Sequence, residues 1–207
     1  MLDIKRISFS ELKNWKDCPY RHKLIYIDKL SHFEGNEYTA FGTAIHAVCE
    51  NTIPNSKLSP IQIFESHFAE ELKILQQNGT SINTSLIEDM KKQAIPICNQ
   101  VLPAVRDYFG PFEVVSVEEE ILEPIQEFES FGKNFKGFID MVIKTPDDKY
   151  HIIDWKTCSW GWSRDKKADP IINYQLTLYK NYFSKKHNIE AKSIETYFVL
   201  LKRTAKN

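Results

Sequence analysis

Two apolar segments late in the chain are each interrupted by an aspartate. They read GFIDMVIK and YHIIDWKT, and a short polar turn, TPDDK, joins them. Apolar runs on either side of such a turn predict two neighbouring antiparallel strands. Asp140 then lies near the region of Asp154, and two carboxylates on adjacent strands repel one another unless a cation lies between them. The pair of segments therefore favours a sheet that carries a polar site, although an exposed aspartate at a strand end would also explain Asp140.

The second segment also contains a lysine two residues after its aspartate. Side chains alternate across a strand, so Asp154 and Lys156 share one face and Trp155 points the other way, into packing. Buried charges are costly unless they are paired or bind a metal. A cross-strand ion pair, or an aspartate at a strand end, would also explain this short pattern. If a metal binds, the oxygen ligands suit Mg²⁺ or Mn²⁺.

Residues 10–109 have mainly helical spacing. We expect helices after a Ser10 cap, from Ala40 to Glu50, over 59–77 with Ser59 as cap and Pro60 first, and over 84–109 with kinks or breaks at Pro96 and Pro103. The segment RHKLIYIDKL is compatible with a strand or a helix, and residues 31–39 are expected to form a loop.

The hydrophobic period changes after residue 110. Strands are predicted over 113–127 and over the two aspartate segments, which together form a meander. A loop, CSWGWSRDKKADP, a helix over 171–187 and a last strand, SIETYFVLLKR, follow, and that strand is apolar enough to be central. We therefore expect an α/β fold with a central mixed β-sheet flanked by helices. The whole of 1–207 would be one domain, with a helical lobe at about 10–109 and a sheet-containing core at about 113–203.

Composition and charge exclude several classes of protein. No run of eighteen apolar residues and no apolar leader occur, which predicts a cytoplasmic protein without a membrane partner. The four cysteines are widely separated and are expected to be reduced. Lys and Arg number seven against four Asp and Glu in residues 1–30, five against sixteen in 31–130, and fifteen against eight in 131–207. Such asymmetry can place a basic surface beside an acidic helical lobe.

Two helical segments carry further polar candidates. His46 follows Gly42 by four residues in FGTAIHAVCE, and the glycine would allow a close backbone approach there. Gln175 and Tyr179 have i, i+4 spacing and share a helix face. Taken singly, a packed histidine and an ordinary half-buried helix are the simpler explanations.

The order of these motifs is more specific than any one of them. A helical G-x-x-x-H, a strand G-x-x-D with Gly137 and Asp140, a strand D-x-K and a helical Q-x-x-x-Y resemble the RecB-like branch of the PD-(D/E)xK nuclease superfamily. The N-terminal SFSELKNWKDCPYRHKL also resembles the opening helix of that branch, which includes AddB-type and CRISPR-associated exonucleases. The resemblance covers roughly residues 8–201 and implies a restriction-endonuclease-like core.

The resemblance implies a metal-dependent DNA nuclease. Mg²⁺ or Mn²⁺ would be held by His46, Asp140, Asp154 and the main-chain carbonyl of Trp155, with Asp140, Asp154 and Lys156 as catalytic residues. Lys156 would position or deprotonate the attacking water, or stabilise the anionic transition state. Gln175 and Tyr179 would hold the scissile strand or brace Lys156. A further acidic position matches one of Glu118, Glu119 and Glu120, and the sequence does not choose among them.

The loop that follows the D-x-K strand is a candidate DNA-binding segment. Arg164, Lys166 and Lys167 could contact phosphates, and Trp160 and Trp162 could stack on bases of single-stranded DNA or else pack inward. The expected substrate is DNA that is single-stranded or has a free end, in recombination, repair or replication, with proteins of those processes as candidate partners. A viral origin would place the chain in the host-cell cytoplasm.

The chain departs in one respect from the family that it resembles. Some members bind an iron–sulfur cluster through one N-terminal cysteine and three C-terminal ones; Cys18 matches the first, but no cysteine follows Cys158, so no cluster is expected. Two other functions remain open beside an exonuclease: a restriction-type endonuclease, and a non-catalytic DNA-binding subunit of a recombination complex.

Overall fold

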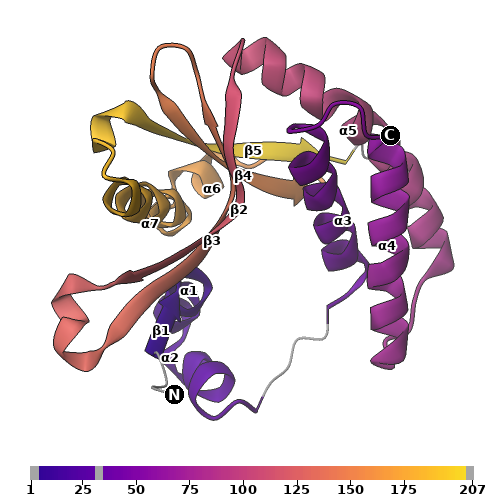
Figure 1. The fold of residues 1–207 in the computed structure, drawn as a ribbon. Coiled ribbons are helices and arrows are strands. Elements are labelled where there is room, and N and C mark those ends of the chain that lie inside the picture. The colour runs from indigo at the N-terminus through magenta and orange to yellow at the C-terminus, as the bar shows by residue number, and fades with distance from the viewer. Residues whose placement is uncertain (1–4, 31–34, 204–207) are drawn as a thin grey trace.

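The computed structural model describes residues 5–30 and 35–203, which form a mixed sheet with helices on both faces (Figure 1). The five strands are β1 (Lys5–Ser8), β2 (Glu113–Pro124), β3 (Lys133–Lys144), β4 (Tyr150–Cys158) and β5 (Ile194–Lys202). On one side, strand β3 pairs antiparallel with β2 along nearly all its length. On its other side, the first residues of β3 pair in parallel with β1 and its last residues pair antiparallel with β4. Strand β5 is parallel to β4. The predicted meander and the α/β fold class are confirmed.

The helices gather in two groups. They are α1 (Phe9–Asp17), α2 (Pro19–His22), a π-helix (Lys23–Ile27), α3 (Glu37–Thr52), α4 (Pro60–Gln77), α5 (Thr84–Phe109), α6 (Arg164–Ala168), α7 (Pro170–His187), and 3-10 turns at Gln126–Phe131 and Ala191–Ser193. Helices α3, α4 and α5 cover one face of the sheet and α7 covers the other (Figure 1). Consecutive residues of β4 serve both faces: Ile153 packs with α3–α5 and Ile152 packs with α7. Among the described residues, no helix combines the length and the apolar character that a bilayer crossing requires.

Several N-terminal boundaries differ from prediction. Ser8, not Ser10, caps α1, because its side chain accepts a hydrogen bond from the Glu11 N–H, and β1 was not predicted at all. The ambiguous segment RHKLIYIDKL is helical as far as Ile27. Helix α3 begins at Glu37 rather than Ala40, because the Asn36 side chain accepts from two backbone N–H groups in a capping box. Residues 37–39 are therefore helical, although a loop was predicted over 31–39. Residues 31–34 of that predicted loop lie outside the described residues.

Helix α5 runs unbroken past both prolines that were expected to kink or break it. Pro96 and Pro103 both lie on its exposed face, where water can bind the carbonyl groups that each proline leaves without a partner. Its opposite face is buried along the whole length, from Ile87 to Val105. Packing of that face holds the helix together where local propensity disfavours it. Helix α4, with Ser59 as its cap and Pro60 first, is as predicted.

The prediction for the last strand was wrong. In the described part of the chain β5 pairs with β4 alone, so it is an edge strand and not a central one. It is apolar because helices cover both of its faces, α5 on one side and α7 on the other. The strand predicted over 113–127 also ends earlier, at Pro124, and the loop expected after β4 contains the short helix α6.

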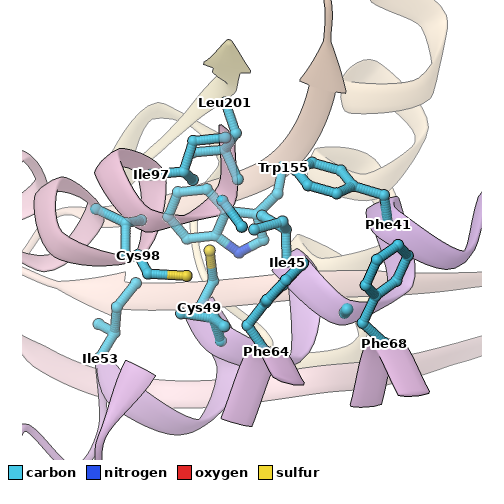
Figure 2. Packing of buried hydrophobic residues seen from close by; sticks show 14 of the residues in the cluster. Phe41, Ile45, Cys49, Ile53, Phe64, Phe68, Ile97, Cys98, Trp155 and Leu201 are labelled. Atoms are coloured by element: carbon cyan, nitrogen blue, oxygen red, sulfur yellow. The ribbon is translucent and has the colours of Figure 1, made fainter. Parts of the chain in front are cut away.

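The side chain of Trp155 anchors β4 in the larger core. It is fully buried between α3 and α5, beside Ile45, Cys49 and Ile97 (Figure 2). Its indole N–H is buried without a hydrogen-bond partner in the described residues, which underlines how apolar this environment is. Since side chains alternate, this packing turns the neighbouring Asp154 and Lys156 to the other face of the strand.

Candidate active site

Asp140 and Asp154 meet where β3 and β4 separate. The last backbone pair of the two strands is Met141 with Ile153, and the aspartates are the next residues on each strand. Asp140 Oδ2 instead accepts a 2.7 Å hydrogen bond from the Trp155 N–H. Burial raises the pKa of each aspartate to about 6. The separation of the strands thus places two buried carboxylates side by side, as the sequence predicted.

The two oxygens of Asp154 have different surroundings. Its residue is only 1% exposed, and Oδ1 accepts a 2.8 Å hydrogen bond from Gln175 Nε2. Lys156 Nζ forms an ion pair with Oδ2 at 2.5 Å. No donor in the described part of the chain makes a well-aligned hydrogen bond to Oδ2, however. That oxygen therefore keeps lone-pair capacity for a further positively charged ligand.

Gln175 and Tyr179 lie on the face of α7 that meets the sheet. Gln175 Nε2 lies 3.2 Å from the Tyr179 hydroxyl, and the tyrosine is buried. A Cβ at Gly137 would come within 2.7 Å of Tyr179 Cε1, so only glycine lets the ring pack this closely on β3. In the structure Gln175 contacts Asp154 directly and Tyr179 contacts Gln175. Holding the scissile strand and bracing Lys156 both stay predictions for this pair.

His46 reaches the aspartates from α3. Its Nδ1 lies 3.6 Å from Asp140 Oδ2, and a Cβ at Gly42 would lie 3.3 Å from Thr157 Oγ1, so the glycine brings α3 close to β4. Burial and the Lys156 charge lower the pKa of His46, whereas a backbone hydrogen bond with Trp155 acts in the opposite direction. A neutral imidazole of this kind can donate a lone pair to a metal.

Two glutamates, Glu50 and Glu118, form a cluster with His46. One ligand atom from each of His46, Glu50 and Glu118 lies within 4.8 Å of the others. Burial, and then the charge of Glu118, raise the pKa of Glu50 to about 8. Glu50 was not among the residues predicted from the sequence, although its i+4 spacing from His46 on one helix was a usable signal.

The structure distinguishes among the three consecutive glutamates of β2. Glu118 faces the cluster, and its backbone has a φ of +47°, a left-handed conformation unusual in a strand. Glu119 instead pairs with Lys186 and His187, and Glu120 pairs with Lys136. Only Glu118 therefore has a place near Asp140.

The donor set fits a divalent cation. It combines the ligand atoms of His46, Glu50 and Glu118, which lie within 4.8 Å of one another, with the buried carboxylates of Asp140 and Asp154. This mixture of oxygen and nitrogen ligands suits Mn²⁺ or Mg²⁺. Burial raises the pKa of three of these carboxyl groups, which means that their ionised forms lack sufficient compensation from the protein alone. A bound cation would provide that compensation.

The predicted DNA-binding cations lie on α6, which follows the site strand. Arg164, Lys166 and Lys167 are all exposed. The segment returns toward the site, because the Trp162 ring packs 5.0 Å from the Phe198 ring and Lys156 Nζ lies 5.7 Å from that same ring. The basic helix and the site lysine are thus connected through the rings of Trp162 and Phe198.

A mixed sheet whose splayed strands carry two aspartates and a lysine defines a hydrolase core of the nuclease type. A family model described as the PD-(D/E)XK nuclease superfamily matches residues 6–207, and the chain belongs to this superfamily. No curated protein matches the chain at a significant level. Members of the superfamily use divalent metals, in agreement with the donor set described above.

Proposed function

We propose that this chain is a divalent-metal-dependent deoxyribonuclease, and more narrowly an exonuclease of the RecB-like branch that prefers single-stranded DNA. The observation that carries the proposal is the arrangement around Asp154: Gln175 holds one oxygen, Lys156 lies beside the other, and Asp140 and His46 complete a buried set of metal donors. DNA recombination, repair or replication, in a cell or a virus, would supply such a substrate.

His46, Asp140, Asp154 and the Trp155 carbonyl would hold the cation, and Glu50 with Glu118 would extend the site. When bound, the cation supplies an activated water and neutralises charge on the phosphodiester. Asp154 holds the Lys156 ammonium at 2.5 Å, and the lysine side chain remains 34% exposed toward incoming substrate. From there it would position the attacking water or donate to a phosphate oxygen that gains negative charge. Gln175 and Tyr179 would keep the Asp154 carboxylate in one orientation.

A DNA substrate with a free end agrees with the exposed cations of α6. Arg164, Lys166 and Lys167 lie close enough in sequence to follow successive phosphates of one strand as it leaves the site. Preference for an end over an internal bond rests on the resemblance to RecB-like exonucleases.

The decisive experiment compares linear and circular single-stranded DNA. Each would be incubated with the protein in Mn²⁺, Mg²⁺ or EDTA, with linear substrates labelled at one end and an RNA of the same sequence in parallel. We expect metal-dependent degradation of linear DNA alone, and the position of the label gives the polarity. Cleaved circles would indicate an endonuclease instead. Tight binding with no cleavage in either metal would indicate a non-catalytic subunit and would refute the proposal.

A further inference from the structure

The four tryptophans of the chain differ sharply in exposure. Trp155 is fully buried and Trp162 is half-buried, whereas Trp15 and Trp160 are 57% and 69% exposed. Trp160 lies in the short segment between the end of β4 at Cys158 and the start of α6 at Arg164. Other large side chains, such as Tyr108 and Phe131, are as exposed, but Trp160 differs from them in following directly after the strand that carries Asp154 and Lys156.

Residues on both sides of Trp160 are anchored to the protein. On its N-terminal side, Ser159 accepts a hydrogen bond from the Arg203 guanidinium, and the Arg203 N–H donates to the Cys158 carbonyl at 2.8 Å. Arg203 is itself buried, and its guanidinium lies 4.8 Å from the ring of Tyr38. On the C-terminal side, the Trp162 ring packs against Phe198. Trp160 is therefore an exposed ring on a backbone that is held at both ends.

The contact between Trp162 and Phe198 also places the C-terminal end of this segment near Lys156. Phe198 contacts both Trp162 and the Lys156 ammonium, and Lys166 Nζ lies 4.8 Å from the Trp162 ring. Two packed rings thus lie between the site lysine and a cation of α6. Surfaces that bind single-stranded nucleic acid combine cations that contact the backbone with aromatic rings that stack on bases.

We propose that Trp160 is a stacking platform for an unpaired base of the nucleic-acid strand that enters the site. This inference rests on the proposed nuclease function and deepens it, because a base can stack on an indole only when it is not paired within a duplex. Trp162 would be the structural anchor of the platform, and Lys166 would contact a neighbouring phosphate. Trp160 would thereby select single strands, or ends that fray.

The test measures binding without cleavage. Protein carrying Lys156→Ala would be titrated in EDTA into three fluorescently labelled probes: an oligothymidylate, an abasic strand of the same length, and a blunt duplex. In this background Trp160→Leu should weaken oligothymidylate binding roughly 5- to 100-fold, the range expected for one stacked base. Binding of the abasic strand and of the duplex should change less than twofold, and Trp160→Phe should restore most of the loss.

Trp15→Leu is the matched control, since it removes the other exposed tryptophan from α1. It should leave all three affinities unchanged, and circular dichroism should show that every variant remains folded. Equal weakening of the thymidylate and abasic probes by Trp160→Leu, or no weakening of either, would overturn the inference. This outcome does not depend on cleavage. If the wild-type protein cleaved no DNA in Mn²⁺, base-dependent binding through Trp160 would still support the platform. If the protein were an active nuclease whose DNA binding did not depend on the bases, the platform alone would be refuted.

Discussion

The amide of Gln175 donates a 2.8 Å hydrogen bond to Asp154 Oδ1 from a helix that follows β4 in the chain. The contact occupies one carboxylate oxygen and leaves the other for the Lys156 ammonium and a cation. It also shows why a glutamine and a tyrosine at helical spacing accompany a D-x-K strand: Gln175 bridges the Tyr179 hydroxyl and the aspartate. The helix thus controls the orientation of the carboxylate on the strand.

Replacing Gln175 by alanine should lower both metal affinity and nuclease activity by about 10- to 100-fold, as is common when a residue that orients a metal ligand is removed. The Asp154 carboxylate would lose the donor to Oδ1 and could rotate. Isothermal titration calorimetry with Mn²⁺ measures the affinity. Thr177→Ala, an exposed position on the same helix, is the control. Unchanged Mn²⁺ affinity in Gln175→Ala would show that the hydrogen bond has no orienting role.

Replacing Lys156 by alanine should reduce the cleavage rate about 10²- to 10³-fold, the effect typical of one charged contact that stabilises a transition state. DNA binding should remain nearly unchanged, because the lysine acts on charge that develops in the transition state. Single-turnover cleavage of an end-labelled strand measures the rate. Lys192→Ala removes a highly exposed lysine and should cleave normally. A Lys156→Ala protein that cleaves at the wild-type rate would refute the site assignment.

The two neighbouring glutamates of β2 provide a matched pair. Glu118→Gln should weaken Mn²⁺ binding several-fold or more, because Glu118 is part of the cluster with His46 and Glu50. Glu119→Gln should leave Mn²⁺ affinity unchanged, since Glu119 pairs with Lys186 on another part of the surface. Calorimetry on both variants distinguishes these outcomes. Equal effects from both substitutions would mean that Glu118 acts only through overall charge.

Alanine at Gly137 should destabilise the protein by about 1–3 kcal/mol, the usual cost of adding a methyl group to a well-packed core. The new Cβ would lie 2.7 Å from Tyr179 Cε1 and would displace that ring. In a domain of this size each kcal/mol lowers Tm by roughly 2–4 °C, which differential scanning calorimetry can resolve. Gly161→Ala, where nothing lies within 4 Å of the added Cβ, should change Tm little. A similar Tm for both variants would contradict the close packing at Gly137.

The opposite end of β4 should carry a pH-dependent contribution to stability. His151 is buried, and burial lowers its pKa below the ordinary 6.5, although the nearby Glu195 and Asp147 act in the other direction. As pH falls, the unfolded chain binds the proton first, so the contribution of neutral His151 is complete above about pH 6.5 and is lost below it. The wild type should therefore lose more Tm than His151→Gln between pH 7.5 and 5.5.

The same pair of measurements on His67→Gln controls for the general effect of removing a histidine. His67 lies on α4, away from the network around His151. If wild type and His151→Gln lost the same Tm on acidification, His151 would not be the titrating group.

The sequence by itself determined the local elements and the class of the fold. Alternation of side chains and the short TPDDK turn predicted β3 and β4 as neighbours, with Asp140 near Asp154, because strand periodicity and turn chemistry act over a few residues. The boundaries that were wrong at α1 and α3 depended on which of several polar residues caps the helix. The unbroken α5 depended on packing that local propensity does not contain.

The tertiary structure alone decided the contacts between distant segments. It assigned Glu118 rather than Glu119 or Glu120 to the cluster, brought in Glu50, directed Gln175 to Asp154, and made β5 an edge strand. It also separated Trp160 from Trp162, two residues of the same type in one short loop. These outcomes depend on how strands twist apart and how helices pack across them. Such geometry arises from the whole core at once, and no short stretch of sequence encodes it.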